Sequence, residues 1–237
     1  KRVKLARKFS AAFTHYFPHD DVKAYNDFYD QTVQFMSGDM AEPFDIQREP
    51  ANLRNQYGNT PFGQGALLAR RLVERGVRYV EVTSNQNWDS MHGGTNSLPR
   101  LTGELDGTVS ALMNDLRDRG LLGTTMIVVT TEFGRTPKVK GNGGRDHHPN
   151  GFSAMLAGGG VKGGIAVGET DENGRDPFPE YEPRDLHATI ATALGMTGTK
   201  IRRLPGRPSF LGGKPKPIQE ILASLFFTSS GSESPSR

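Results

Sequence analysis

The sequence predicts an α/β fold in which helices cover both faces of a largely parallel sheet, a three-layer α/β/α sandwich. Two short runs, residues 126–130 and 152–157, have the hydrophobic character of strands that are buried on both faces. Along the chain the patterns follow one another as helix, strand, helix, strand, loop and strand. This order is typical of a layered sheet with right-handed crossover connections.

Helical patterns open the chain. Apolar residues recur near helical spacing in residues 3–17, and two aspartates can cap a second helix over residues 20–36. A short helix is predicted for residues 49–57, with Gly58 as its terminator. The first third of the chain is therefore expected to be helical, apart from a loop over residues 38–50.

The middle of the chain alternates between helix and strand. Thr60, followed by a proline, is a typical helix start, and the apolar pattern after it runs to Gly76. Residues 77–82 have the alternation of a strand. Leucines in residues 98–116 step by three or four positions and predict a long amphipathic helix that ends at a glycine.

The last third begins with a glycine-rich segment, residues 158–164, which lacks the spacing of a phosphate-binding loop and is predicted to be a tight turn. A short strand over residues 165–167 and a helix over residues 183–194 follow. Residues 1–225 are expected to form a single domain. Residues 226–237 are polar and aperiodic, so they are expected to be a disordered tail.

Composition excludes several classes of protein. Of the 237 residues, 35% are hydrophobic, and no apolar run approaches the roughly 20 residues of a membrane helix. The net charge of +3 is spread along the chain, which argues against nucleic-acid binding. Without cysteine, any metal must be held by oxygen and imidazole. No export signal is visible, and the compartment and oligomeric state are left open.

Two acidic and histidine-bearing segments could hold a metal. Asp89 and His92 lie beside the only tryptophan and combine the ligand types that zinc or manganese accepts, although an Asp that caps a turn beside a surface His explains them equally well. The second segment is a rarer cluster, Asp146, His147 and His148. The alternative to a metal site is that these residues lie in an exposed polar loop. Because neighbours in an extended segment point to opposite sides, one histidine is expected to face the site.

Two further residues follow the strand predicted at residues 126–130. Glu132 could ligate a metal or act as a general acid or base, and Arg135 could hold an anionic oxygen in bidentate geometry. Ligands of open α/β sheets bind beyond the carboxyl ends of the strands, which is where both residues are expected. A simple ion pair between Glu132 and Arg135 is the alternative.

Several motifs together resemble one known family. They are TTEFGRTP, GRDHHPNGFSAMLAGGGVKGG, PFGQGALLARRLVERGVRYVEV, WDSMH and PRDLHATIATALG. Over residues 1–225 the chain resembles domain-of-unknown-function family 1501, bacterial proteins related to sulfatases and to the alkaline-phosphatase-like superfamily. The resemblance implies an alkaline-phosphatase-like sandwich and metal-dependent hydrolysis of small sulfate or phosphate esters. The alternative is a non-catalytic binding or structural protein that retains the fold.

The resemblance also implies roles for single residues. Asp89 and His92 resemble the Asp and His of the first metal site, which His147 or His148 would complete with zinc, manganese or calcium. Glu132 stands where relatives often have an Asp-His pair, so a second metal is not expected. Because Met91 intervenes, His92 lies three positions after Asp89, whereas the resemblance implies a histidine two positions after the Asp. The chain also resembles the carboxyl-terminal part of a longer family member, so its nucleophile is not identified and little turnover is expected from it alone.

Overall fold

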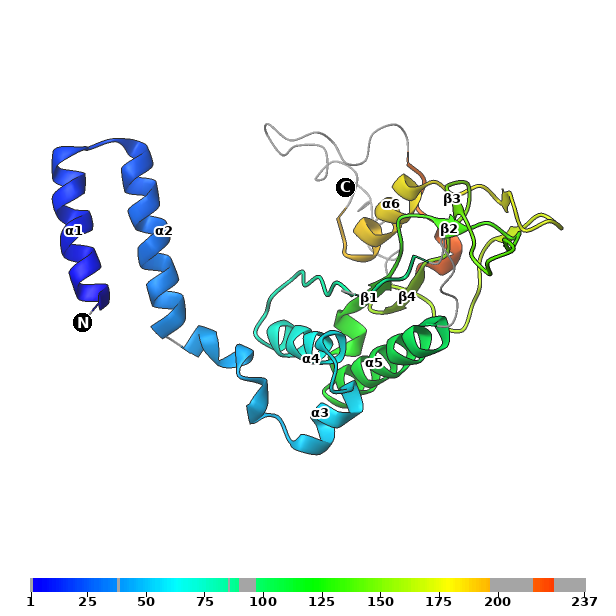
Figure 1. Ribbon diagram of the computed structural model, residues 1–237, viewed down its shortest axis with the longest axis horizontal. Helices are drawn as coiled ribbons and strands as arrows, with labels where there is room; N and C mark the ends of the chain where they lie inside the picture. The colour runs from blue at the N-terminus through cyan, green and yellow to red at the C-terminus, as the bar shows by residue number, and fades with distance from the viewer. Residues whose placement is uncertain (1, 38, 85, 90–96, 197–214, 224–237) are drawn as a thin grey trace, which may run out of the picture.

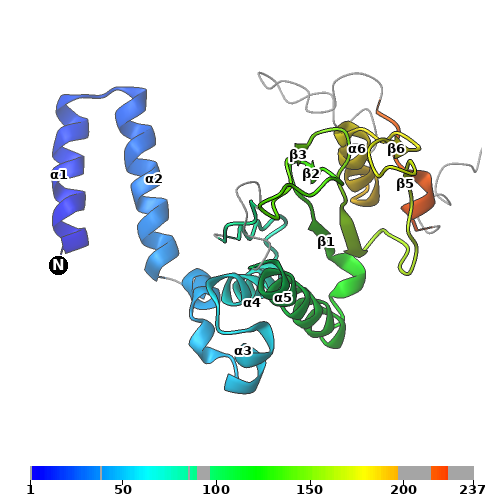
Figure 2. The same ribbon diagram turned by 45° about the vertical axis from the view of Figure 1, so that its right-hand side comes forward.

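The computed structural model describes residues 2–37, 39–84, 86–89, 97–196 and 215–223. A hairpin of two helices stands apart from a larger body, and the two parts are joined by a short helical segment (Figure 1). The same separation is visible after a 45° turn (Figure 2). Within the body, the paired strands β1 and β4 lie between helix α5 on one side and helix α6 on the other.

The hairpin consists of helices α1 (Arg2–Tyr16) and α2 (Asp20–Ser37), both as predicted. Small and polar residues form the seam between them: Asn26 donates to the hydroxyl of Thr14 over 2.6 Å. Closer to the open end, the guanidinium of Arg7 bonds Asp30 over 2.8 Å. The two helices are thus tied to each other through polar contacts.

The α-helices of the body also follow the sequence prediction: α3 (Ala51–Tyr57), α4 (Pro61–Glu74) and α5 (Leu98–Asp118). The segment predicted as a loop contains two short 3₁₀ helices instead, η1 (Asp39–Phe44) and η2 (Ile46–Arg48). The Thr60 hydroxyl caps α4 by accepting from the Gly63 amide over 3.1 Å. Tyr57, Ala66 and Leu67 are buried at the centre, where α3, α4 and α5 meet.

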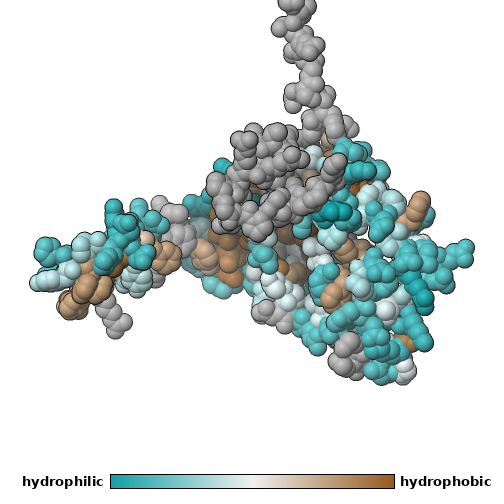
Figure 3. Space-filling view, turned by 90° about the horizontal axis from the view of Figure 1, so that it is seen from above, coloured by the Kyte–Doolittle hydropathy of each residue, from teal (hydrophilic) through white to brown (hydrophobic). Residues whose placement is uncertain are grey.

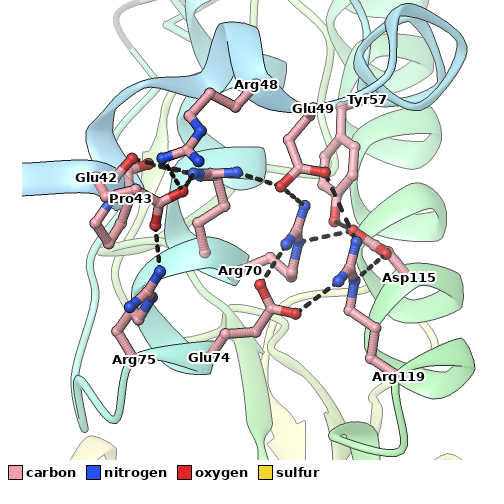
Figure 4. Close-up of polar contacts among 11 residues, drawn as sticks. Glu42, Pro43, Arg48, Glu49, Tyr57, Arg70, Glu74, Arg75, Asp115 and Arg119 are labelled. Atoms are coloured by element: carbon pink, nitrogen blue, oxygen red, sulfur yellow. Dashed lines mark hydrogen bonds and ion pairs between the residues drawn. The ribbon is translucent and has the colours of Figure 1, made fainter. Parts of the chain in front are cut away.

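A layer of buried charge closes this apolar core (Figure 4). The Arg70 side chain is completely buried among the carboxylates of Glu49, Glu74 and Asp115. Its Nε and Nη2 lie 2.9 Å from Asp115 and 2.8 Å from Glu49, at angles that make ion pairs and not hydrogen bonds. Asp115 also accepts from the Tyr57 hydroxyl over 2.8 Å. These ion pairs tie α4 to α5 and to the segment that precedes α3.

Arg71, the neighbour of Arg70, ties the same helix to η1. Its Nε donates to the carbonyl of Pro43 over 2.7 Å, and its Nη2 bonds the carboxylate of Glu42 over 2.8 Å. Arg71 also pairs with Glu49. Since an unpaired buried guanidinium would be costly, these partners make the burial of two adjacent arginines tolerable.

Short antiparallel ribbons make up the strand part of the body. Strand β1 (Met126–Val129), which follows η4 (Leu122–Thr124), pairs antiparallel with β4 (Met155–Gly158). Between them in sequence, β2 (Gly134–Arg135) pairs with β3 (His147–His148). One ribbon therefore contains two ladders, separated by residues 130–133 on one strand and by the longer segment 149–154 on the other.

The predicted three-layer α/β/α sandwich with a largely parallel sheet is wrong. The described residues contain only two-stranded antiparallel sheets: β1 with β4, β2 with β3, and β5 (Glu169–Thr170) with β6 (Pro177–Phe178). A parallel pair needs a crossover connection, usually a helix. Residues 130–154 return directly through the β2–β3 hairpin, so β4 runs antiparallel to β1. The prediction that residues 152–157 form a central strand is wrong for the same reason.

Two other predicted strands do not form. Residues 77–82 and 165–167 are without regular secondary structure. The Tyr79 side chain is 79% exposed, so the alternating pattern of its segment does not mark one buried face. A strand is stable only when a neighbour satisfies its backbone groups, and neither segment has a ladder partner among the described residues.

The carboxyl-terminal part of the body contains α6 (Pro183–Ala193) and η5 (Gln219–Ile221). The Ile218 amide donates to the buried hydroxyl of Thr189 over 2.8 Å, which fixes η5 against α6. The predicted glycine turn at residues 158–164 is confirmed. At Gly158, with φ 89°, a Cβ would lie 2.2 Å from the carbonyl oxygen of Thr125.

Two remaining predictions concern the limits of the folded part. The predicted tail, residues 226–237, lies outside the described residues, and the single domain over residues 1–225 stays a prediction. Across the described ranges, no helix is both long and apolar enough to cross a membrane.

Candidate functional site

The candidate site lies on the β2–β3 hairpin. Arg135 and His147 are direct cross-strand partners in this ladder, so their side chains leave the same face of the ribbon. Asp89 reaches them from the segment that follows α4 in sequence. Gln86, three residues earlier, accepts from Arg100 of α5 over 3.2 Å and so anchors that segment.

An acid, a base and a guanidinium meet at this point. Nη1 of Arg135 donates to Oδ1 of Asp89 over 2.7 Å. Nε2 of His147 lies 3.7 Å from Oδ2 of the same carboxylate. The side chains of Asp89 and His147 are about two-fifths exposed and that of Arg135 is 24% exposed, so solvent reaches the cluster and screens its charges.

Phe133 provides an aromatic surface beneath the two basic side chains. Its ring centroid lies 4.2 Å from that of His147 at an interplanar angle of 33°. The guanidinium carbon of Arg135 lies 5.6 Å from the same ring centroid. A cation over an aromatic face is favourable, so Phe133 orients both Arg135 and His147 toward Asp89.

Close backbone packing shapes the hairpin that carries these residues. A Cβ added at Gly134 would lie 2.1 Å from the carbonyl oxygen of Gly151, so only glycine allows this approach. Beyond the ladder, two hydrogen bonds join Thr136 and Asp146. The Thr136 amide donates to the Asp146 carbonyl over 3.0 Å, and the Asp146 amide donates to the Thr136 hydroxyl over 3.1 Å. The hairpin is thus held on both sides of the Arg135–His147 pair.

The other residues predicted for the site point elsewhere. His148 contacts the carbonyl of Arg175 over 2.5 Å through its Nε2. The Asp146 carboxylate pairs with Lys140, and Glu132 is exposed in the loop between β1 and β2. The two histidines of β3 point to opposite sides, as their alternation predicts: His147 lies near Asp89, and His148 contacts the carbonyl of Arg175. Arg135 pairs with Asp89 and not with Glu132, which was the alternative considered from the sequence.

The donor atoms of Asp89 and His147 suit a divalent ion. Two ligands that each bind one zinc ion at about 2.0–2.2 Å lie 3–4 Å apart, and the measured separation of Oδ2 and Nε2 is 3.7 Å. The predicted partner His92 lies outside the described residues. Within the ranges that the structure describes, no group of three or more His, Asp or Glu side chains could hold a metal. Asp89 and His147 could supply two ligands at this spacing.

Sequence reasoning missed two groups of residues. Phe133 is two positions before Arg135, and residues two apart in an extended segment share a face, so this alternation was a usable signal. The buried ion pairs of Arg70 were missed as well. Arg70 follows Ala66 at helical spacing, on the buried face of α4, and a charge at an apolar position of a helix marks a buried ion pair.

Comparisons with known proteins place the chain in one family. The model of the family described as "Protein of unknown function (DUF1501)" matches residues 1–222. Neither the comparison with curated proteins nor the comparison with solved structures gave a match. With both its helical part and the Asp89–Arg135–His147 cluster inside the matched range, the chain belongs to the DUF1501 family.

Proposed function

We propose that this chain carries the metal- and anion-binding part of a metal-dependent hydrolase of small sulfate or phosphate esters, at the Asp89–Arg135–His147 cluster, with little turnover from the chain alone. One observation carries the proposal: residues 46 positions apart in sequence bring a carboxylate, a guanidinium and an imidazole into contact. Such a set can bind a divalent ion and an anion side by side. The proposed relationship of the family to sulfatases and alkaline phosphatases agrees with this chemistry.

Asp89 and His147 are the proposed metal ligands, with His92 as a further candidate. A bound zinc, manganese or calcium ion would supply polarisation of an ester oxygen. The bond from Arg135 leaves Oδ2 of Asp89 directed at His147, so the carboxylate serves both neighbours. Metal ligation requires the ionised form of the carboxylate.

Arg135 is the proposed anion clamp. Only its Nη1 bonds Asp89, and a guanidinium carries five N–H donors in a planar fork. The remaining donors can hold two oxygens of a sulfuryl or phosphoryl group and offset negative charge that develops on them. Phe133 limits the positions of this guanidinium. The exposed carboxylate of Glu132, three residues earlier, is the proposed general acid or base.

A non-catalytic anion-binding protein is the second candidate. The observation that favours it is the Asp89–Arg135 ion pair itself, because a carboxylate already neutralised by a guanidinium attracts a cation less strongly. In that case Arg135 and His147 would bind an anionic ligand without a metal. Metal content therefore separates the two candidates.

The test combines elemental analysis with hydrolysis of nitrophenyl sulfate and nitrophenyl phosphate. Protein purified without chelator should contain about one divalent ion per chain, and Asp89→Asn or His147→Ala should lose it. Matched controls are Asp146→Asn and His148→Ala, which change the same residue types at positions that contact Lys140 and Arg175 instead. Metal content that survives both site variants, or is lost equally in the controls, would contradict the proposed site. Metal-free protein that binds sulfate through Arg135 would support the second candidate.

A further inference from the structure

The α1–α2 hairpin exposes an unusual amount of aromatic surface. Five aromatic side chains line an open groove of about 660 Å³ along the hairpin: Phe9, Phe13, Tyr16, Phe17 and Tyr25. Each of them is 48–76% exposed, and Leu5 and Phe28, one helical step further along the two helices, are 56% and 69% exposed. Figure 3 shows the apolar side chains of the hairpin gathered along one side and polar side chains along the other.

The groove runs along the contact between the two helices, and only its floor belongs to that contact. Ser10 and Asn26 lie in the floor, beside the Thr14–Asn26 hydrogen bond, whereas the aromatic side chains line the groove and stay exposed. The hairpin also stands apart from the body, so the described residues of the body leave the groove open (Figures 1 and 2). Amphipathic helices gain most of their stability by burying an apolar face, and here that face is turned outward.

The exposed area matches what a stable dimer buries. With about 150–250 Å² for each aromatic side chain, the groove residues together with Leu5 and Phe28 expose roughly 800 Å². A standard protein interface buries about 800 Å² per partner. Patches of this size on a monomer usually mark an interaction surface.

Charge identifies the partner. In α1, Lys4, Arg7 and Lys8 are basic and no residue is acidic. In α2, four aspartates stand against a single lysine: Asp20, Asp21, Asp27 and Asp30. Arg7 and Asp30 already pair within the hairpin, so the lysines of α1 and the other aspartates of α2 are the charges that a partner would meet. The second copy can be related to the first by a two-fold axis that runs parallel to the helices, between the two groove faces. Each α1 then lies against the α2 of the other copy, so that every new helix pair joins opposite charges.

We propose that two copies of this chain associate through their α1–α2 hairpins to form an antiparallel four-helix bundle with the groove aromatics in its core. Helices of 15 and 18 residues are long enough for four to five turns of packing. A basic aromatic helix such as α1 could also bind an anionic membrane surface. The aspartates of α2 argue against it, because Asp21 lines the same groove and would be repelled by anionic lipid.

Sedimentation velocity on the full 237-residue chain tests the proposal. Wild-type protein at micromolar concentration should sediment as a dimer, and Phe13→Asp with Tyr25→Asp should raise the dimer dissociation constant by roughly 100-fold or more. Phe178→Asp is the control, because Phe178 is equally exposed on β6, in the body, and should leave the dimer intact. Circular dichroism should show unchanged helix content in both variants. If the aspartates melt the hairpin, Phe9→Ser with Tyr16→Ser is the milder pair, with the same expected dissociation.

A charge exchange tests the arrangement of the helices. Chains with Lys4→Glu and Lys8→Glu should dimerise weakly with themselves, as should chains with Asp21→Lys and Asp27→Lys. A mixture of the two should form heterodimers, since every α1–α2 contact between copies regains opposite charges. A monomeric wild type would overturn the proposal. So would a monomer that floats with phosphatidylcholine–phosphatidylserine vesicles, or a dimer that survives the groove variants with its affinity unchanged.

Discussion

The guanidinium of Arg135 bonds the carboxylate of Asp89 over 2.7 Å, and this bond joins the β2–β3 hairpin to the segment that follows α4. Both side chains are partly exposed, so the pair is expected to contribute little to stability. Asp89→Asn should lower the free energy of unfolding by no more than about 1 kcal/mol while it abolishes the proposed metal binding. Urea denaturation of both proteins in chelator checks the first effect. A loss several times larger would mean that Asp89 has a structural role instead.

Close packing at Gly134 leads to a prediction about the hairpin that carries the site. Gly134→Ala places a Cβ within 2.1 Å of the Gly151 carbonyl oxygen, so the strands must separate, at a cost of about 1–3 kcal/mol. Gly141→Ala in the same hairpin is the matched control, because nothing lies within 4 Å of its added Cβ. The midpoint of thermal unfolding should be lower for Gly134→Ala than for wild type, and it should be unchanged for Gly141→Ala. Equal effects of the two substitutions would contradict the packing argument.

The buried charge around Arg70 predicts a large effect of removing one partner. Arg70→Met removes the completely buried cation from the carboxylates of Glu49, Glu74 and Asp115 and leaves them the partly exposed guanidinium of Arg119, which should cost about 3 kcal/mol. Arg117→Met, also on a helix of the body, removes an exposed guanidinium that pairs with its neighbour Asp118. The free energy of unfolding of Arg117→Met should stay within about 0.5 kcal/mol of the wild-type value. Chemical denaturation of both variants measures the difference, and similar losses would show that burial does not decide the cost.

Glu49 gives this part of the body a dependence on pH. Burial by itself raises the pKa of Glu49, but the guanidinium groups of Arg70 and Arg71 outweigh burial and hold the pKa below its ordinary value of 4.5. The unfolded chain therefore takes up the proton first as pH falls, and the stabilisation present above pH 4.5 is lost below it. Thermal midpoints between neutral pH and pH 3 should fall less steeply for Glu49→Gln than for wild type. Parallel curves would contradict this assignment.

Helices were predictable from the sequence because their signals are local. Spacing, caps and terminating glycines lie within the helix that they specify, as with Thr60 and α4. The sheet was not predictable in this way, because the direction of β4 relative to β1 depends on the connection between them. An apolar run has the same appearance in a buried parallel strand and in a half-covered antiparallel ribbon.

For the candidate site, the sequence predicted the residues better than their contacts. Asp89, Arg135 and His147 were all candidates, and the alternation along β3 predicted that His147 and His148 point to opposite sides without saying which of them lies near Asp89. It could not show that Arg135 pairs with Asp89 in place of Glu132, since that choice depends on where a loop 46 positions away is anchored. The roles of these residues in binding or catalysis stay predictions.

The nested ladders of the β1–β4 ribbon also set the order in which the site assembles during folding. Arg135, His147 and Phe133 meet within one hairpin, and short loops of about ten residues close in about 10–100 ns. The carboxylate of Asp89 must arrive across 46 residues that include all of α5, so its loop closes at a higher entropic cost. The basic half of the site therefore forms as a local unit, and the acidic group joins it only when the helical and strand parts of the body dock.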